Sequence, residues 1–336
     1  MEVTPCKKSN DERIDKEEED YKMGTLAYFR ANERRRFLHG MVKFLPKSLQ
    51  SRLTVLKNMQ IDYFDIERQL YEEMFYIERK YHEKLVSLYN KRKDIISGKL
   101  EPDNELPKWK EFKENSSEMP LNYDYCNILK IYKSVNEETK GVPNFWLTVL
   151  KTSERISDII YELDEPLLSK LTDITIDYND LSYTIEFHFD ENEYIHNKLL
   201  TKQYFLSKSL DMEYPFNYDG PNVIKCVGCE IEWKDGKNLT VKKIKYSEEE
   251  DDVVPVASFF HFFNPPKLSK EDMDVETQEI LFIDFEIGQF MRDELIPRAI
   301  LFFTGDYFED SEHFIEEKIA KNGYELSGNF KKLHIK

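Results

Sequence analysis

An uninterrupted helical segment constrains this chain more than any other feature, since residues 47–97 run for fifty-one positions without a glycine or a proline. Apolar side chains recur there at steps of three, four or seven residues, which is the period of one face of an α-helix. At about 1.5 Å per residue the helix would be about 75 Å long, more than one compact domain can cover. The stripe consists of Leu49, Leu53, Leu56, Tyr63, Ile66, Leu70, Met74, Ile77, Tyr81, Leu85 and Leu88.

An apolar stripe of this length needs a partner helix, and the sequence offers no second helical stripe of matching reach. The simplest partner is a second copy of the same chain, paired as in a coiled coil. We therefore predict a homodimer joined through this helix. The alternative is a long helix that folds back on its own domain.

Charge is distributed unevenly along the 336 residues, whose formal net charge is −17. Residues 1–100 carry 21 basic and 17 acidic side chains, whereas residues 101–336 carry 27 basic and 48 acidic ones. Such an acidic excess repels nucleic acid and attracts basic proteins, and the attraction weakens as salt is added. We therefore expect no direct nucleic-acid partner. The alternative is that the surface acid serves only solubility.

Targeting signals and cysteine content indicate the cellular compartment in which the protein resides. The sequence contains no apolar run of 18 or more residues, so we expect no membrane span. Its first residues lack the basic-then-apolar order of a signal peptide. Cys6, Cys126, Cys226 and Cys229 are too few for a disulfide scaffold and fit a reducing compartment. We expect a protein of the cytoplasm or nucleus.

Composition and periodicity divide the chain into four parts. We expect a disordered acidic tail (1–25), a helical dimerisation region (26–98) that contains the long helix 47–97, an acidic α/β domain (99–310) and a C-terminal tail (311–336). Further helices are expected at Leu26–Leu45, Tyr123–Ser134, Phe145–Tyr161, Asp164–Leu171 and Val275–Phe303, the last interrupted near Pro297.

Alternating apolar and polar residues predict strands in the domain. They fall at Tyr183–Phe189, Leu199–Lys208, Lys225–Trp233 and Leu239–Tyr246, the last two joined by the turn Asp235–Asn238. Consecutive strands with short connections favour an antiparallel sheet. The predicted fold class is α+β: a long dimerisation helix and an antiparallel β-sheet with helices on one face and the other face able to meet a ligand.

Conventional catalytic and metal-binding motifs are nearly absent. Cys226 and Cys229 form a CVGC motif, but no second cysteine pair or histidine pair completes a tetrahedral zinc site. Thiol redox would favour a helix N-terminus, whereas these cysteines lie in a predicted strand, so we interpret them as small apolar strand residues. The histidines are scattered and no glycine-rich phosphate loop is present. These motifs do not support an enzymatic activity, although they do not exclude one, and we expect no cofactor and no metal.

Two charge runs remain. Glu248–Asp252 places five carboxylates side by side, which predicts a projecting hairpin tip or a flexible loop. Ser247 directly precedes this run and matches the preference of acid-directed kinases, so it is a candidate phosphorylation site. Arg34, Arg35 and Arg36 flank the first helix; they would contact nucleic acid or, more usually, form a solvated face or pair with the acidic second half of the chain.

Several unusual strings occur in order along the chain. They are GVPNFWL (141–147), LDEPL (163–167), IEFHF (185–189), FNYDGP (216–221), GCEIEWK (228–234), SFFHFFNPP (258–266), DFEIG (284–288), LIPRA (295–299) and FTG (303–305). The long helix adds LTVLKNMQ (53–60) and EMFYIERKY (73–81). Together, from about Leu26 to Phe308, these strings resemble the nucleosome assembly protein family of histone chaperones.

The resemblance implies a fold and a partner. It implies a dimer joined by long antiparallel helices, with an α/β domain at each end whose concave acidic underside binds core histones. It implies no catalysis and no metal. Histones are strongly basic and bind DNA through counterion release, so an acidic surface competes for them.

The resemblance also suggests contact residues, because acids near the helices and the sheet meet histone in this family. The matching positions are Glu162, Asp164 and Glu165, and weaker candidates are Glu186, Asp284 and Glu286. Each of these six could instead be a solvated acid or a structural cap.

The sequence departs from the family pattern at two places, and these departures bear on localisation and on the capture of histones by a C-terminal tail. The chain ends in KKLHIK instead of a long acidic tail, and residues 248–252 are acidic where relatives often carry a basic import signal. We therefore expect a cytoplasmic protein, with shuttling to the nucleus as a further expectation. Relatives carry an export signal on the long helix, and here Leu49, Leu53, Leu56, Met59 and Ile61 fit the leucine-rich pattern. Burial within the stripe is the alternative for these residues.

Three functions are considered, and the third is an enzyme that uses the Cys226 and Cys229 pair. The first is a histone chaperone that binds core histones for transport and nucleosome assembly. The alternative is an acidic dimeric scaffold or transport adaptor for non-histone basic proteins.

Overall fold

The computed structural model describes residues 31–110, 132–133, 135–218, 220, 223–245, 251–266 and 275–307. The chain divides into two compact units, one bounded by Met1–Gln69 and Leu210–Tyr218, the other by Leu70–Ser209 and Asp219–Lys336. The expected tails (1–25 and 311–336), Ser247 and nearly all of the expected helix Tyr123–Ser134 lie outside the described residues.

The first unit contains helix α2 (Ala31–Phe44) and the N-terminal part of helix α3 (Lys47–Ile96). The chain turns between them at Pro46, where the Gln50 side chain donates hydrogen bonds to the carbonyls of Lys43 (3.1 Å) and Leu45 (2.7 Å). The loop 210–218, with the short 3₁₀ helix Pro215–Asn217, packs on α3 through a contact of 4.3 Å between the Lys57 ammonium and the centre of the Phe216 ring. The predicted long helix is confirmed, and so is the break before it.

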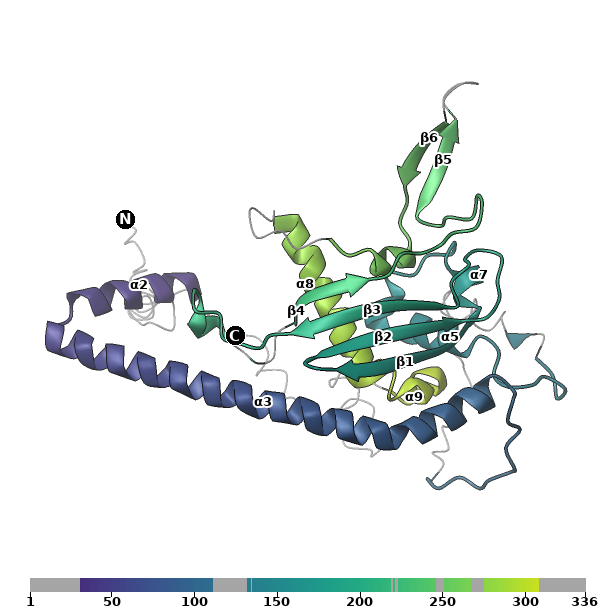
Figure 1. Ribbon diagram of the computed structural model, residues 1–336, viewed down its shortest axis with the longest axis horizontal. Helices are drawn as coiled ribbons and strands as arrows, with labels where there is room; N and C mark the ends of the chain where they lie inside the picture. The colour runs from purple at the N-terminus through teal and green to yellow at the C-terminus, as the bar shows by residue number, and fades with distance from the viewer. Residues whose placement is uncertain are drawn as a thin grey trace, which may run out of the picture. The chain divides into compact units, whose positions relative to one another are not determined.

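The second unit is built on a four-stranded antiparallel sheet with the order β1-β2-β3-β4 (Figure 1). Its strands are β1 (Leu171–Asn179), β2 (Ser182–Phe189), β3 (Leu199–Leu206) and β4 (Val223–Gly228). The register pairs Ile176 with Ile185, Phe187 with Leu200, and Tyr204 with Cys226.

Helices cover one face of this sheet, and the face toward the viewer in Figure 1 carries none of the described helices. The covering helices are α5 (Phe145–Thr152), α8 (Val275–Phe290) and α9 (Ala299–Thr304), while α6 (Glu154–Ser157) and α7 (Glu165–Leu168) lead from α5 to β1. Trp146, Tyr183, Phe187 and Tyr204 fill the space between sheet and helices and are fully buried. The predicted α+β class, with an antiparallel sheet covered by helices, is confirmed.

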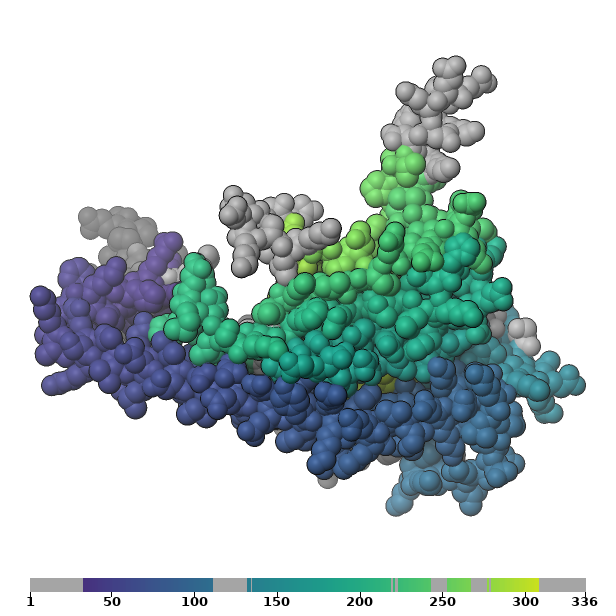
Figure 2. All heavy atoms as spheres, in the orientation of Figure 1, coloured from purple at the N-terminus to yellow at the C-terminus, as the bar shows by residue number. Residues whose placement is uncertain are grey.

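A second, two-stranded sheet pairs β5 (Val241–Lys245) with β6 (Asp251–Pro255). This hairpin stands out from the surface of its unit (Figure 2). The sequence prediction was wrong in pairing Lys225–Trp233 with Leu239–Tyr246, because β4 pairs with β3 and β5 pairs with β6. Strand β1 was missed, although Ile174, Ile176 and Tyr178 alternate with polar residues as a strand requires.

Two predicted helices are interrupted. The expected helix Phe145–Tyr161 breaks at Ser153, which is buried in an extended conformation (φ −81°, ψ 122°) between α5 and α6. The expected interruption of the helix Val275–Phe303 near Pro297 is confirmed, and it takes the form of a π-helical turn at Met291–Leu295 before α9 begins at Ala299. Pro297 explains the change, since a proline cannot donate a backbone hydrogen bond and its ring clashes with the preceding turn of a regular α-helix.

None of the described helices combines the length and the apolar composition that crossing a bilayer needs.

Candidate functional site

The six acids that the family resemblance suggested occupy different environments, and Asp164 is internal. It is fully buried at the start of α7. One carboxylate oxygen accepts a hydrogen bond from the Ser258 hydroxyl (2.6 Å), and the other accepts from the backbone N–H groups of Phe259 (2.8 Å) and Tyr161 (3.0 Å). Asp164 therefore joins the loop before α7 to the 3₁₀ helix Phe259–Phe263, and its carboxylate does not lie on the surface.

Asp284 is also internal. Its carboxylate on α8 pairs with the fully buried ammonium of Lys202 on β3 and accepts a hydrogen bond of 3.0 Å from the Tyr204 hydroxyl. Burial lowers the pKa of Lys202, and the adjacent carboxylate opposes that shift. Burial likewise raises the pKa of Tyr204. The pair fixes α8 on the sheet, so Asp284 too is excluded from the set of surface acids.

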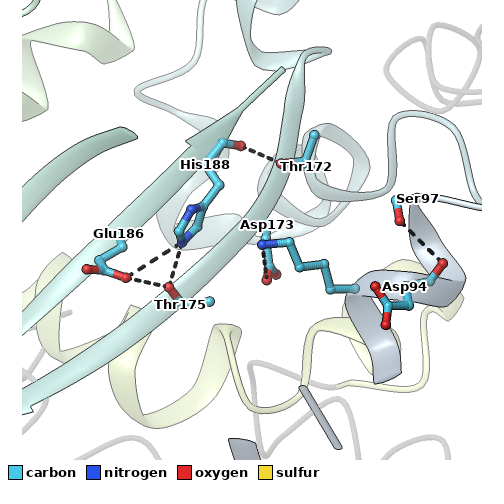
Figure 3. A network of polar contacts seen from close by, with 8 residues as sticks. Asp94, Ser97, Thr172, Asp173, Thr175, Glu186 and His188 are labelled. Atoms are coloured by element: carbon cyan, nitrogen blue, oxygen red, sulfur yellow. Dashed lines mark hydrogen bonds and ion pairs between the residues drawn. The ribbon is translucent and has the colours of Figure 1, made fainter. Parts of the chain in front are cut away.

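Glu165 and Glu186 are half-buried and already have partners. Glu165 pairs with the ammonium of Lys151 from α5. Glu186 accepts a hydrogen bond of 2.9 Å from Thr175, whose hydroxyl lies 2.8 Å from the His188 ring (Figure 3). Burial and the Lys93 charge lower the pKa of His188, against the raising effect of Glu186. Both acids retain a partly accessible edge for a ligand.

Glu162 and Glu286 are exposed. Glu286 borders a hollow of about 320 Å³ on the surface of the second unit, together with Arg155 from α6 and Asp293 and Glu294 from the π-helical turn. Asp293 pairs with Arg292, and Glu294 pairs with Arg298. Sequence reasoning missed Asp293, although it lies seven residues after Glu286 and therefore on the same side of a helix.

Many acids of the second unit are exposed, and four of them belong to the segment from α6 to α7 or to α8 and the π-helical turn after it. We refer to Asp158, Glu162, Glu286 and Asp293 as the exposed acidic set, because all four are solvent-exposed. Asp158 follows α6, the short helix whose Arg155 borders the hollow beside Glu286, and Asp293 borders the same hollow.

Helix α3 carries two distinct apolar stripes. Phe75 is buried, and its ring and that of His82 lie 5.5 and 5.0 Å from the ring of Tyr178 on β1. The dimerisation residues predicted from the sequence lie on another side of the helix: ten of the eleven are 38–67% exposed, and Leu53 is half-buried. The predicted stripe is thus not used for packing on the sheet and stays accessible to a partner.

The N-terminal part of α3 also carries the residues of the proposed nuclear export signal. Leu49, Leu56 and Met59 are exposed, whereas Leu53 and Ile61 are half-buried.

The C-terminal end of α3 is fixed to the sheet by charged groups. The Arg92 guanidinium donates a hydrogen bond of 2.7 Å to the carbonyl of Ile296 and lies over the Trp146 ring. The Lys93 ammonium lies 3.8 Å from the carboxylate of Asp173 on β1, whose side chain is 2% exposed (Figure 3). Burial raises the pKa of Asp173 to about 6, although Arg92 and Lys93 oppose the shift.

The CVGC motif does not form a redox pair. Cys226 lies in β4 and Cys229 directly after it. Three residue steps along an extended chain place their Cα atoms about 10 Å apart, beyond disulfide reach. Burial raises the pKa of the Cys226 thiol to about 12, and the Cys229 sulfur accepts a hydrogen bond of 3.1 Å from the Thr201 N–H. Within the described residues, no three His, Cys, Asp or Glu side chains are grouped to hold a metal ion.

Comparisons with known proteins agree with the resemblance noted in the sequence. The family model described as "Nucleosome assembly protein (NAP)" matches residues 51–306. Nucleosome assembly protein 1-like 1-A of Xenopus laevis is 38% identical over 291 residues, which cover 81% of this chain and 73% of the relative. Nucleosome assembly protein 1-like 4 of Homo sapiens is 37% identical over 295 residues, covering 82% and 78%.

A solved structure, Nucleosome Assembly Protein 1 from Plasmodium knowlesi, is 25% identical to this chain. The match covers 78% of this chain and 98% of that one, with a TM-score of 0.49. The family model spans most of the chain, and the curated relatives are similar over most of both sequences. The chain belongs to the nucleosome assembly protein family.

Proposed function

We propose that this protein is a histone chaperone that binds core histones through acidic side chains of its second unit and takes part in histone transport and nucleosome assembly. The observation that carries the proposal is the family match over residues 51–306. The charge of the chain supports it, because residues 101–336 hold 48 acidic and 27 basic side chains. A surface with this excess attracts cationic polypeptides at a distance and steers their association.

The contact residues follow from accessibility. Asp164 and Asp284 are excluded because their oxygens are occupied inside the domain. Glu162 and Glu286 are retained, with Asp158 and Asp293 added from the structure. Glu165 and Glu186 remain secondary contacts, since each is half-buried and would have to exchange or share its present partner. Asp293 also has a partner, Arg292, but it is solvent-exposed.

The dimer is part of the same proposal. The exposed stripe on α3 is a continuous apolar surface on a helix that spans about 75 Å, and pairing with a second copy would bury it. The stripe lies apart from Phe75 and His82, so dimerisation leaves the packing of α3 on β1 intact.

Localisation is proposed as cytoplasmic with shuttling to the nucleus. Leu53 and Leu56 belong to the export pattern and also to the dimer stripe. A cytoplasmic distribution that survives Leu53→Ala and Leu56→Ala in a folded dimer would remove the export role. Phosphorylation at Ser247 is proposed from the acidic run after it, and absence of phosphate there after treatment with an acid-directed kinase would dismiss it.

The decisive experiment is a titration of the purified protein with each of the core histone pairs at several salt concentrations, with the mass in solution measured in parallel. We expect binding that weakens as salt rises, by a protein with the mass of two chains. Non-histone basic proteins of similar charge serve as competitors. Equal binding of those proteins would favour the alternative, a dimeric adaptor for basic proteins, and no histone binding in dilute buffer would refute the chaperone proposal.

A further inference from the structure

A cavity of about 960 Å³ on the second unit has no part in the proposed histone contacts. One wall is the consecutive run of residues 225–231, which begins in β4, and the other includes Phe260, Pro265 and Pro266. The volume lies near the upper end of the range of about 300–1,000 Å³ that is typical of ligand sites in proteins. We refer to it as the β4 cavity.

Strand β4 is at the edge of the four-stranded sheet (Figure 1). It pairs with β3 on one side, and no strand among the described residues pairs with its other side. The lining of the β4 cavity includes residues of β4 but none of the described residues of β3, so the cavity lies along the free side of the strand. Unpaired N–H and C=O groups on such an edge pair readily with another extended segment.

The walls of the β4 cavity favour a segment with one apolar and one basic side. Trp233 packs edge-on against Phe260, with 5.5 Å between the ring centres, and both rings line the cavity. Glu230 is the acid of the lining; it is exposed and forms no ion pair in the part of the chain that the structure describes. The ammonium of Lys225 lies 5.3 Å from the centre of the Phe205 ring on β3, which places this cation toward β3.

A segment of matching pattern occurs in the sequence outside the described residues. Residues 332–336 read KLHIK, in which Leu333 and Ile335 alternate with Lys332, His334 and Lys336. Strict alternation predicts a half-buried strand with one apolar and one basic face. The histone proposal does not use this segment, because its lysines repel a cationic protein.

The chain is long enough to bring this segment to β4. Residues 308–332 form a connection of 25 residues between Tyr307, the last described residue, and Leu333. Fully extended, such a connection spans about 80 Å. Tyr307 and β4 belong to the same compact unit. A tether of this kind gives an effective concentration of about the millimolar range, which favours the segment of the same chain over that of another molecule.

We propose that residues 332–336 dock in the β4 cavity of their own chain as a fifth strand on the free edge of β4. Leu333 and Ile335 pack on the apolar wall, and the lysines lie on the solvent side near Glu230. The docked segment covers an edge that would otherwise invite pairing with other chains. It also closes the β4 cavity to any other extended peptide until it is released.

The test uses Cys229 as a reporter in the full chain. Cys229 has a free thiol, is half-buried and lines the β4 cavity, so a docked segment should shield it. The rate of its alkylation by N-ethylmaleimide is measured by mass spectrometry of peptides, which resolves each cysteine. Leu333→Asp with Ile335→Asp should raise this rate on the order of tenfold, because the segment loses the apolar side chains that hold it. A wild type that reacts as fast as the variant would overturn the proposal.

A matched control separates the segment from the charge of the tail. Ile315→Asp with Ile319→Asp adds the same two charges outside residues 332–336 and should leave the rate at the wild-type value. Equal acceleration by both double variants would overturn the proposal. The wild-type rate should not depend on protein concentration. Protection of Cys229 that increases with concentration would also overturn it, because the docking segment would then come from another molecule.

Backbone pairing has its own readout, amide hydrogen exchange. Exchange over Val223–Gly228 should be slower in wild type than in Leu333→Asp with Ile335→Asp, since docking pairs the free edge. Strand β1 is the opposite edge of the same sheet, so its exchange should be the same in both proteins and serves as the control for folding. Equal exchange of β4 in the two proteins would overturn the fifth strand.

A synthetic peptide tests the fit of the sequence to the β4 cavity directly. The peptide FKKLHIK, residues 330–336, is added to the Leu333→Asp, Ile335→Asp protein. It should slow the alkylation of Cys229 in a saturable manner, whereas the same peptide carrying both aspartates should not. No protection by the native peptide, or equal protection by both peptides, would overturn the proposal.

Discussion

The carboxylate of Asp164 accepts hydrogen bonds from donors on two segments that are far apart in the sequence, Tyr161 on one side and Ser258 and Phe259 on the other. Asp164→Ala should lower the free energy of unfolding by about 2–3 kcal/mol, because it leaves buried donors without an acceptor. Chemical denaturation measures this. Glu162→Ala, at an exposed position two residues earlier, should change stability by no more than about 0.5 kcal/mol. A loss of histone affinity in folded Asp164→Ala protein would contradict the structural role.

A second residue-scale prediction concerns pH. The folded-state pKa of Asp173, about 6, exceeds its ordinary value of 3.8, so the folded state holds the proton more tightly. The stability that protonation of Asp173 confers is complete below about pH 4 and is lost as pH rises through 6, which amounts to about 2–3 kcal/mol. The Asp173→Asn variant has no carboxyl group at this position, so its free energy of unfolding should not show this decrease as pH rises. The measurement is the free energy of unfolding of both proteins between pH 4 and 7; a wild-type minus variant difference that stays constant or rises with pH would exclude the assignment.

At the scale of single elements, replacing either of two helical glycines by alanine should have opposite effects on stability. A Cβ at Gly288 on α8 would collide with the buried ring of Tyr204, whereas a Cβ at Gly40 on α2 meets nothing within 4 Å. Gly288→Ala should therefore destabilise the protein by about 1–3 kcal/mol through overpacking. Gly40→Ala should stabilise it by about 0.5–1 kcal/mol, since alanine favours the helix. Thermal denaturation of both variants checks the pair, and destabilisation by Gly40→Ala would mean that this face of α2 is covered.

The dimer prediction belongs to helix α3. Ile66→Glu with Leu70→Glu places two charges in the exposed stripe, where both residues are more than half exposed in the single chain. Burying those charges against a partner helix is unfavourable, so the variant should sediment as one chain. The control Thr54→Glu with Asn90→Glu adds the same charge on the opposite side of the helix and should remain dimeric. A single-chain mass for the wild type itself would refute the stripe as an interface.

Local patterns explain which elements were predictable. The long helix has no internal glycine or proline and a sustained period, so its bounds were predicted to within one residue. The pairing of β4 and β5 was mispredicted because a turn between two strands in sequence does not determine which strand lies beside which, and β5 finds β6 instead. The π-helical turn depends on Pro297 acting several residues upstream, which periodicity does not reveal.

The candidate site was less predictable than the fold. The sequence shows where an acid is, but not whether its carboxylate oxygens already bind a partner inside the domain. The carboxylate of Asp164 binds Ser258, and that of Asp284 binds Lys202; these partners lie 94 and 82 residues away in the sequence. Asp293 became apparent only when the structure placed it beside Glu286 at one hollow, and Asp158 follows the short helix whose Arg155 borders that hollow. Contacts between distant segments therefore decided the choice of binding acids.

At the scale of the whole molecule, histone binding should be distributed over many charges. Exposed ion pairs contribute about 0.2–1 kcal/mol each, so Glu162→Gln or Glu286→Gln alone should weaken histone affinity by no more than about fivefold. Asp158→Lys, Glu162→Lys, Glu286→Lys replaces three attractions by three repulsions and should weaken it by more than about tenfold at low salt, with a smaller effect as salt rises. Fluorescence titration with a purified core histone pair measures both.

The control Glu101→Lys, Asp103→Lys, Glu137→Lys makes the same charge change at exposed positions outside the set. Equal losses in the two triple variants would mean that net charge alone governs binding, whereas a loss confined to the first would locate the histone at α6 and α8.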